Sequence, residues 1–168
     1  MDEEKRAVDS DGYDAADRPF DFVEIGGETA LVCEFDPVLR EKIVKELDAL
    51  GYRITAAPAA KDALKAMRFH VFDLVVLNEL FDTVDSQENA VLHYLEEMLM
   101  STRRRFFVVL VSSRFRTMDN MAAFNRSVNM VVNPANSDDF GKIIKQGVVE
   151  NKAFYHVLLE TLQKMGKA

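Results

Sequence analysis

Leu74-Val75-Val76-Leu77-Asn78 is an unbroken apolar run that ends on a polar residue. This composition is typical of a strand that is buried on both faces of a parallel sheet. Ligands gather where the carboxyl ends of such strands open into loops, so we expect polar residues that follow such runs to converge on one crevice. Three other runs have this form: Leu31-Val32-Cys33 before Glu34, Phe107-Val108-Val109-Leu110-Val111 before Ser112, and Met130-Val131-Val132 before Asn133.

Helical patterns alternate with these runs. Asp36 and Pro37 mark a helix start and Gly51 a stop, which predicts a helix over 37–50. The alternation predicts an α/β fold with a five-stranded parallel sheet, doubly wound, in a flavodoxin-like three-layer sandwich. The other expected elements are strands at 52–56, 72–78, 106–112 and 129–133, a helix from Ala60, a helix capped by Ser86 with an apolar stripe from Val91 to Leu99, a short helix at 119–126, and a last helix capped by Ser137.

The chain divides into four segments by composition and pattern. Residues 1–19 are acidic and lack an apolar period, as a disordered tail does. Residues 20–27 alternate apolar with polar side chains before a glycine pair, which favours an extra strand or hairpin. We expect the sheet domain over 28–148 and a helical extension over 149–168.

Composition excludes several classes of function. The chain has 168 residues, enough for one self-sufficient core, and its single cysteine, Cys33, rules out a disulfide framework and a cysteine-rich zinc site. The net charge of −7 does not favour nucleic-acid binding. Arg103-Arg104-Arg105 is a local basic run, which is either a solvated helix end or a site that binds an acidic partner or the acidic tail of this chain. No apolar stretch of membrane-spanning length or signal peptide is present, so we expect a cytoplasmic protein without a membrane partner.

Over residues 28–148, the order of elements and the strand endings resemble the receiver domain of bacterial response regulators. In that family the third strand ends on the phosphate-accepting aspartate, and Asn78 stands in that place here. Asn133-Pro134 replaces the lysine-proline pair, Met130 replaces the switch aromatic, and Ser112 keeps the family's hydroxyl. An amide cannot form an acyl phosphate, so the resemblance implies a pseudo-receiver that is not an enzyme and needs no cofactor.

The resemblance places a vestigial phosphoacceptor pocket in the crevice, formed by Glu34, Asp36, Asn78, Ser112 and Asn133. Glu34 and Asp36 are candidate ligands for a divalent cation, but a hydrogen-bonded crevice without an ion is the favoured interpretation. We expect the amides of Asn78 and Asn133 to face each other and leave the pocket neutral. Two acids follow the acceptor place without occupying a strand terminus, and are therefore not favoured as substitute acceptors: Glu79 and Asp82.

The last helix extends beyond the usual end of a receiver domain. Its apolar residues follow alternating spacings of four and three, which is the seam of a two-stranded coiled coil and predicts a homodimer. The alternative is that the extension folds back through a break at Gly147. The predicted seam contains Ile144, Val148, Asn151, Tyr155, Leu158, Leu162 and Met165.

Two functions remain open from the sequence. The first is a non-phosphorylatable, receiver-like module of bacterial signalling or regulation that binds a protein partner or a second copy of itself. The second is a sensor that holds a small molecule or metal in the neutralised crevice at the strand ends.

Overall fold

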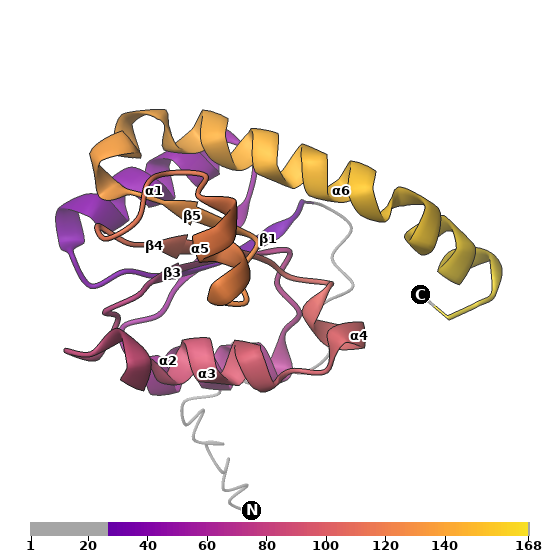
Figure 1. The fold of residues 1–168 in the computed structure, drawn as a ribbon, viewed down its shortest axis with the longest axis horizontal. Coiled ribbons are helices and arrows are strands. Elements are labelled where there is room, and N and C mark those ends of the chain that lie inside the picture. The colour runs from indigo at the N-terminus through magenta and orange to yellow at the C-terminus, as the bar shows by residue number, and fades with distance from the viewer. Residues whose placement is uncertain (1–26, 168) are drawn as a thin grey trace, which may run out of the picture.

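The computed structural model describes residues 27–167. Two predicted segments lie outside the described residues: the acidic tail over 1–19 and, apart from Gly27, the strand or hairpin over 20–27. Strands and helices alternate along the described chain (Figure 1). The elements are β1 (Thr29–Cys33), α1 (Pro37–Ala49), β2 (Arg53–Ala56), α2 (Ala60–Phe69), β3 (Leu74–Asn78), α3 (Ala90–Glu97), α4 (Met100–Arg103), β4 (Phe107–Val111), α5 (Asn120–Asn125), β5 (Met130–Val132) and α6 (Phe140–Lys164), with short 3₁₀ segments at Ser86–Glu88 and Pro134–Asp139.

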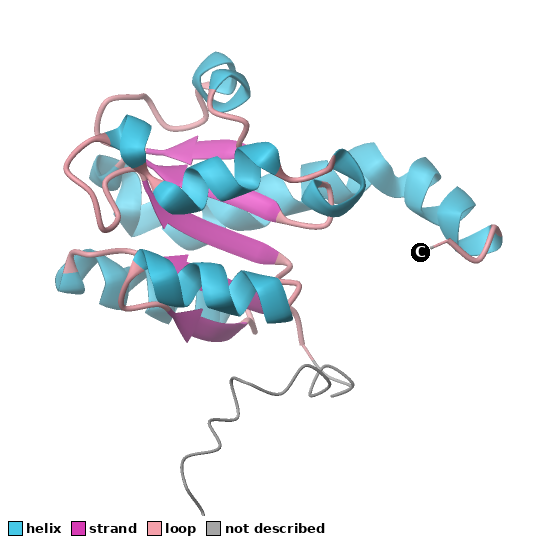
Figure 2. Cartoon of the chain, turned by 90° about the horizontal axis from the view of Figure 1, so that it is seen from below, coloured by secondary structure: helices cyan, strands magenta, loops and turns pink. Residues whose placement is uncertain are grey.

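The strands form one five-stranded sheet in the order β2-β1-β3-β4-β5, and every neighbouring pair is parallel (Figure 2). Consecutive parallel strands need crossover connections, and the helices between them supply these. The structure therefore confirms the predicted doubly wound parallel sheet.

Helices cover both faces of the sheet, so the strands are buried on both sides (Figure 1). Successive side chains of a strand point to opposite faces, so each strand contributes to two apolar clusters. One cluster joins Leu31, Val75, Leu77, Val108 and Leu110 to residues of α2, α3 and α5. The other joins Val32, Val76, Val109 and Val132 to residues of α1 and α6, among them Ile43, Leu47 and Ile144.

The predicted start and stop of α1 are confirmed. The Asp36 carboxylate accepts hydrogen bonds from the backbone N–H groups of Val38 (2.9 Å) and Leu39 (3.4 Å), and Pro37 begins the helix. Gly51 follows the helix with a φ of +87°, a left-handed conformation that favours glycine.

The start and the end predicted for α3 were wrong. Asn89, not Ser86, caps the helix, because its side-chain Oδ1 accepts a hydrogen bond from the Leu92 N–H at 3.0 Å. The helix ends at Glu97, so the apolar stripe does not continue to Leu99, which is 77% exposed.

Ser137 does not cap the last helix. The Asn133 side chain instead accepts a hydrogen bond from the Ala135 N–H at 2.9 Å and begins the 3₁₀ segment that leads into α6. The Ser137 hydroxyl accepts a hydrogen bond from Lys42 of α1 at 3.1 Å and so links two neighbouring elements.

The last helix runs unbroken through Gly147, so the break proposed for a fold-back is absent from it. A Cβ at Gly147 would contact the end of Met130 and lie 3.0 Å from Phe107 Cζ, which shows how closely α6 packs on the sheet. Beyond this contact α6 extends past the sheet (Figures 1 and 2). Within residues 27–167, no helix combines the length and apolar character needed to cross a bilayer.

We expect Gly147→Val to reduce the free energy of unfolding by about 1–3 kcal/mol, because the added side chain overpacks the contact of α6 with β4 and β5. Urea unfolding at neutral pH measures the change. Gln146→Val is the matched control, since Gln146 is exposed on the same helix and receives the same β-branched residue. Equal losses in the two variants would contradict close packing at Gly147.

Candidate functional site

The site predicted as a crevice is the edge of the sheet at the carboxyl ends of the strands, where open α/β sheets bind ligands, and we keep the name crevice for this edge. Glu34 follows β1, Asn78 ends β3, Ser112 follows β4 and Asn133 follows β5. These four strands are neighbours in this order in the sheet, so the fold brings the predicted residues to one edge.

Glu34 and Asn78 form a buried pair at this edge. Glu34 is 1% exposed, and Asn78 Nδ2 donates hydrogen bonds to its Oε1 (3.1 Å) and Oε2 (2.9 Å). The Asp36 N–H also donates to Glu34 Oε1 at 3.0 Å, while Asn78 Oδ1 accepts from the Leu80 N–H at 2.9 Å. These contacts fix the orientation of the Asn78 amide, with its nitrogen toward the carboxylate.

Burial raises the pKa of Glu34 above its usual range, because removal from water disfavours the charged form. The hydrogen bonds from Asn78 and from the backbone lower the pKa but do not outweigh burial, and the charge of Asp36 adds to the increase. The ionised form of Glu34 therefore destabilises the folded state.

A second network contains Glu79, Ser112 and Arg114. Glu79 is 4% exposed, and the Ser112 hydroxyl donates to its Oε1 at 2.7 Å. Arg114 Nη2 donates to Glu79 Oε2 at 2.7 Å and to Ser86 Oγ at 3.0 Å, and Arg114 Nε donates to Glu79 Oε1 at 3.1 Å. The guanidinium thus binds the carboxylate through two nitrogens, an arrangement that combines charge with fixed geometry.

The Glu79 carboxyl shows the opposite shift from that of Glu34. Burial acts to raise its pKa, but the hydrogen bonds from Arg114 and Ser112, together with the Arg114 charge, outweigh burial and lower the pKa. Glu79 is therefore held in its ionised form.

The alternation of side chains along the strands explains why there are two networks. Glu34 and Asn78 continue the alternation on the α1–α6 side of the sheet, where Val32 and Val76 lie. Glu79 and Ser112 continue it on the α2–α3 side. Glu79 follows β3, which ends at Asn78, as expected, but its backbone N–H continues the ladder to the Val111 carbonyl at 3.0 Å and its carboxylate joins Ser112.

The predicted contact between the amides of Asn78 and Asn133 is wrong. Asn133 Nδ2 donates to the carbonyls of Phe115 (2.8 Å) and Ser113 (3.3 Å), whereas the Asn78 amide nitrogen donates to Glu34. Asn133 therefore fixes the loop that follows β4 and does not pair with Asn78.

Sequence reasoning missed Asn89 and Arg114. Asn89 is fully buried, and its Nδ2 donates to the backbone carbonyls of Asn78 (3.2 Å) and Glu79 (3.0 Å). It therefore holds the end of β3 while it caps α3. An acid directly after β3 and an arginine soon after the neighbouring β4 are the signal that could have predicted the pair of Glu79 and Arg114.

The Asp36 carboxylate caps α1, while the Asp36 backbone N–H donates to Glu34. The described residues contain no group of three or more His, Cys, Asp or Glu side chains arranged to hold a metal. Glu34 and Asp36 remain the two acids of the crevice on the α1 side.

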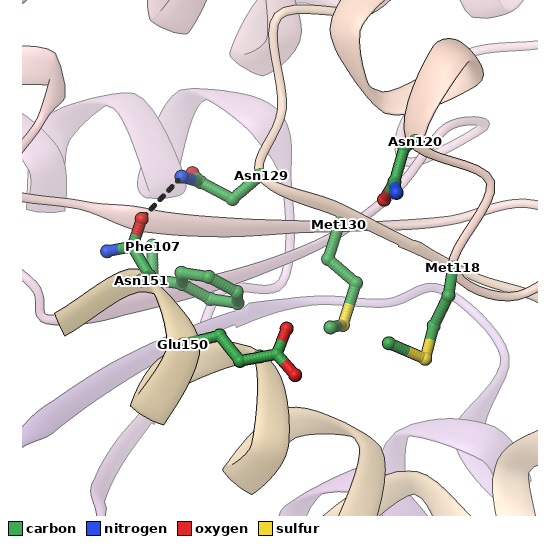
Figure 3. A pocket seen from close by; sticks show the side chains of 8 residues that line it. Phe107, Met118, Asn120, Asn129, Met130, Glu150 and Asn151 are labelled. Atoms are coloured by element: carbon green, nitrogen blue, oxygen red, sulfur yellow. Dashed lines mark hydrogen bonds between the residues drawn. The ribbon is translucent and has the colours of Figure 1, made fainter. Parts of the chain in front are cut away.

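Part of the predicted coiled-coil seam lies in the core of this chain. Ile144 is fully buried, Val148 packs against the same cluster, and Asn151 accepts a hydrogen bond from Asn129 Nδ2 at 3.4 Å (Figure 3). A pocket of about 170 Å³ beside this contact is lined by Phe107, Met118, Asn120, Asn129, Met130, Gly147, Glu150 and Asn151.

Comparison with solved structures places the chain among receiver folds. A response regulator from Chloroflexus aurantiacus is 14% identical over 73% of this chain and 98% of that one, with a TM-score of 0.59. The receiver domain of the Francisella response regulator 1452 is 16% identical over 75% and 100% of the two chains, with a TM-score of 0.59. NtrX from Brucella abortus, solved with ADP, is 19% identical over 84% of this chain and 30% of that one, with a TM-score of 0.62.

These likenesses confirm the CheY-like receiver fold that the sequence resembles. No family model and no curated protein matches the sequence. A receiver fold alone does not define a function, which depends on the residues of the site.

We expect Arg114→Met to reduce the free energy of unfolding by about 1–3 kcal/mol at pH 7, because it leaves the buried Glu79 carboxylate without its cationic partner. Urea unfolding measures the loss. A double variant, Glu79→Gln with Arg114→Met, removes the uncompensated charge and should recover part of it. Arg116→Met, at an exposed arginine of the same loop, is the control, and a loss as large as that of Arg114→Met would argue against the pair.

We expect Glu34→Gln to become increasingly more stable than the wild type as pH rises through the window between the ordinary glutamate pKa and the raised pKa of Glu34. The folded wild type retains the Glu34 proton longer than the unfolded chain, so its stability falls with pH across this window. Urea unfolding between about pH 4 and pH 8 measures the difference between the two proteins.

Glu41→Gln, at an exposed position of α1, is the control for this pH series, and the same pH course in both variants would show that burial of Glu34 is not its cause. The Glu79 contribution cancels because both proteins contain it. If the difference in free energy of unfolding between Glu34→Gln and the wild type did not change with pH, burial would not oppose ionisation of Glu34.

Proposed function

We propose that this chain is a receiver-like protein-interaction module of signalling or regulation that does not accept a phosphoryl group. The orientation of Asn78 carries the proposal. The amide stands at the end of β3, its nitrogen donates to Glu34, and its oxygen accepts from the Leu80 N–H. A carboxamide in this place offers no carboxylate nucleophile for phosphoryl transfer.

The second network supports the same function. The Ser112 hydroxyl already donates to the Glu79 carboxylate, and Arg114 neutralises that charge. A receiver uses the corresponding hydroxyl to respond to the phosphoryl group. Here an internal carboxylate occupies the hydroxyl, so we infer that the crevice stays in one state and that the module acts through its shape and surface.

The setting in signalling rests on the fold. The receiver structures that this chain resembles belong to response regulators, which supports a protein partner and a non-enzymatic role. The two buried acids of the crevice, Glu34 and Glu79, are held in pairs with Asn78 and with Arg114.

A sensor of small molecules or metals receives less support. The polar groups at the strand ends bond to one another. Of the two pockets described in the structure, one lies over β5 and α6, and the other is lined by Ser86 and His93, beside the Arg114 side chain but not among the strand-end residues. Thermal melting with nucleotides and divalent cations tests this alternative, since a ligand that binds only the folded state raises the Tm.

We expect incubation with acetyl phosphate and Mg²⁺ to leave the mass of the intact protein unchanged, because Asn78 cannot be phosphorylated. Mass spectrometry at neutral pH measures the result, and a receiver domain with an intact acceptor aspartate serves as the positive control. An acid-labile adduct of one phosphoryl group would overturn the proposal. If such an adduct formed, its loss in Glu79→Gln or in Asp82→Asn would assign the substitute acceptor.

A further inference from the structure

The C-terminal half of α6 presents large apolar side chains that the rest of residues 27–167 leaves exposed. Phe154 is 80% exposed, Leu159 is 42% exposed and Met165 is 58% exposed. Soluble monomers rarely leave a contiguous patch of such side chains uncovered, so this surface needs an occupant. We call it the α6 stripe, and it contains Phe154, Tyr155, Leu158, Leu159, Leu162 and Met165.

The α6 stripe does not have the form of a two-helix seam. Ile144 and Val148 of the predicted seam pack in the core of this chain, and Asn151 bonds to Asn129. In a two-stranded coiled coil, charged residues flank the seam. Phe154 and Leu159 hold those flanking positions here, which makes the apolar surface broader than one partner helix covers.

The described chain begins beside the start of this stripe. Glu28, one residue before β1, forms an ion pair with Lys152 of α6. On the helix surface, Lys152 is a neighbour of Tyr155 of the stripe, three residues later. Glu28 therefore tethers the segment that precedes it beside the uncovered part of α6.

The segment before Glu28 has the reach to cover the stripe. Phe20 lies eight residues before Glu28, and an extended chain spans about 3.3 Å per residue, or about 26 Å in total. The helix from Lys152 to Met165 rises about 1.5 Å per residue, or about 20 Å. The two lengths match closely enough for the segment to run along the whole stripe.

The segment also has the composition that the surface requires. Residues 20–25 supply four apolar side chains, Phe20, Phe22, Val23 and Ile25, within six positions. The first 20 residues of the chain carry a net charge of −4. Tyr155 of the stripe lies within electrostatic range of Arg103, and the adjoining Arg105 is exposed, so a basic run borders the surface on which an acidic segment would lie.

We propose that residues 20–25 bind along the α6 stripe of the same chain. Because the segment is tethered at Glu28, its effective concentration at the stripe is in the millimolar range, well above that of a second copy in dilute solution. The stripe lies beyond the amino ends of the strands, opposite the crevice (Figure 2). Binding of residues 20–25 to the stripe is therefore independent of whether the crevice accepts a phosphoryl group.

Disulfide trapping in the full-length chain tests this contact. We expect a variant with Val23→Cys and Leu158→Cys to form an intramolecular disulfide under a mild oxidant, detected as a monomer of altered mobility on a non-reducing gel and as a linked peptide by mass spectrometry. The native Cys33 does not interfere, since it is fully buried, and burial together with the Glu34 charge raises the pKa of its thiol to about 12.

The matched control pairs Val23→Cys with His156→Cys. His156 lies at nearly the same height on α6, but two residues along a helix rotate the side chain by about 200°, away from the stripe. Its side chain is 75% exposed, so accessibility does not limit its reaction. Equal trapping in both variants, or no trapping in either, would overturn the proposal. A disulfide-linked dimer through Leu158→Cys would assign the stripe to a second copy instead.

Hydrogen exchange gives a second readout without cysteine chemistry. In the full-length chain, replacing Phe20 and Phe22 by serine should accelerate amide exchange over residues 154–165 by at least several-fold, while exchange in β3 and β4 stays unchanged. Val8→Ser, at an apolar residue of the tail outside the segment, is the control. Unchanged exchange over residues 154–165 would contradict the contact even if the protein is monomeric.

Discussion

The buried carboxylate of Glu34 is the constraint on which the crevice depends. A carboxylate removed from water needs donors, and within the crevice the side-chain donor is the Asn78 amide at 2.9 Å rather than a cation. A neutral amide satisfies the oxygens without adding charge, whereas an aspartate at position 78 would place a second carboxylate against the first. In the proposed function, the amide that donates to Glu34 is also the side chain that leaves this place without a carboxylate nucleophile.

The sheet was predictable because its signal is local and repeated. Each apolar run specifies a strand buried on both faces, and Asp36 and Asp119 each cap a helix that begins one residue later. The sequence analysis did not predict that the crevice contains two separate hydrogen-bond networks, although the alternation of side chains along a strand implies them. The end of β3 places Asn78 and Glu79 on opposite faces, so each of them finds its own partners.

Helix boundaries and polar partners were harder to predict because they depend on contacts between distant residues. Asn89 caps α3 and at the same time binds the carbonyls that end β3, so its position satisfies two elements together. Ser86 is an equally good cap by residue type, but its hydroxyl accepts from Arg114, a residue 28 positions away. Local propensity does not distinguish the two, and the tertiary hydrogen bonds decide between them.

The last helix connects the core of the domain to its most exposed surface. Its first half is fixed by Ile144 and by the close approach of Gly147 to Met130 and Phe107, and the same unbroken helix then carries the α6 stripe beyond the sheet. Because the helix is continuous, packing on β4 and β5 sets the direction in which the stripe projects. Under the proposal that residues 20–25 bind the α6 stripe, occupancy of the stripe changes the surface that a partner contacts without any change at the strand ends.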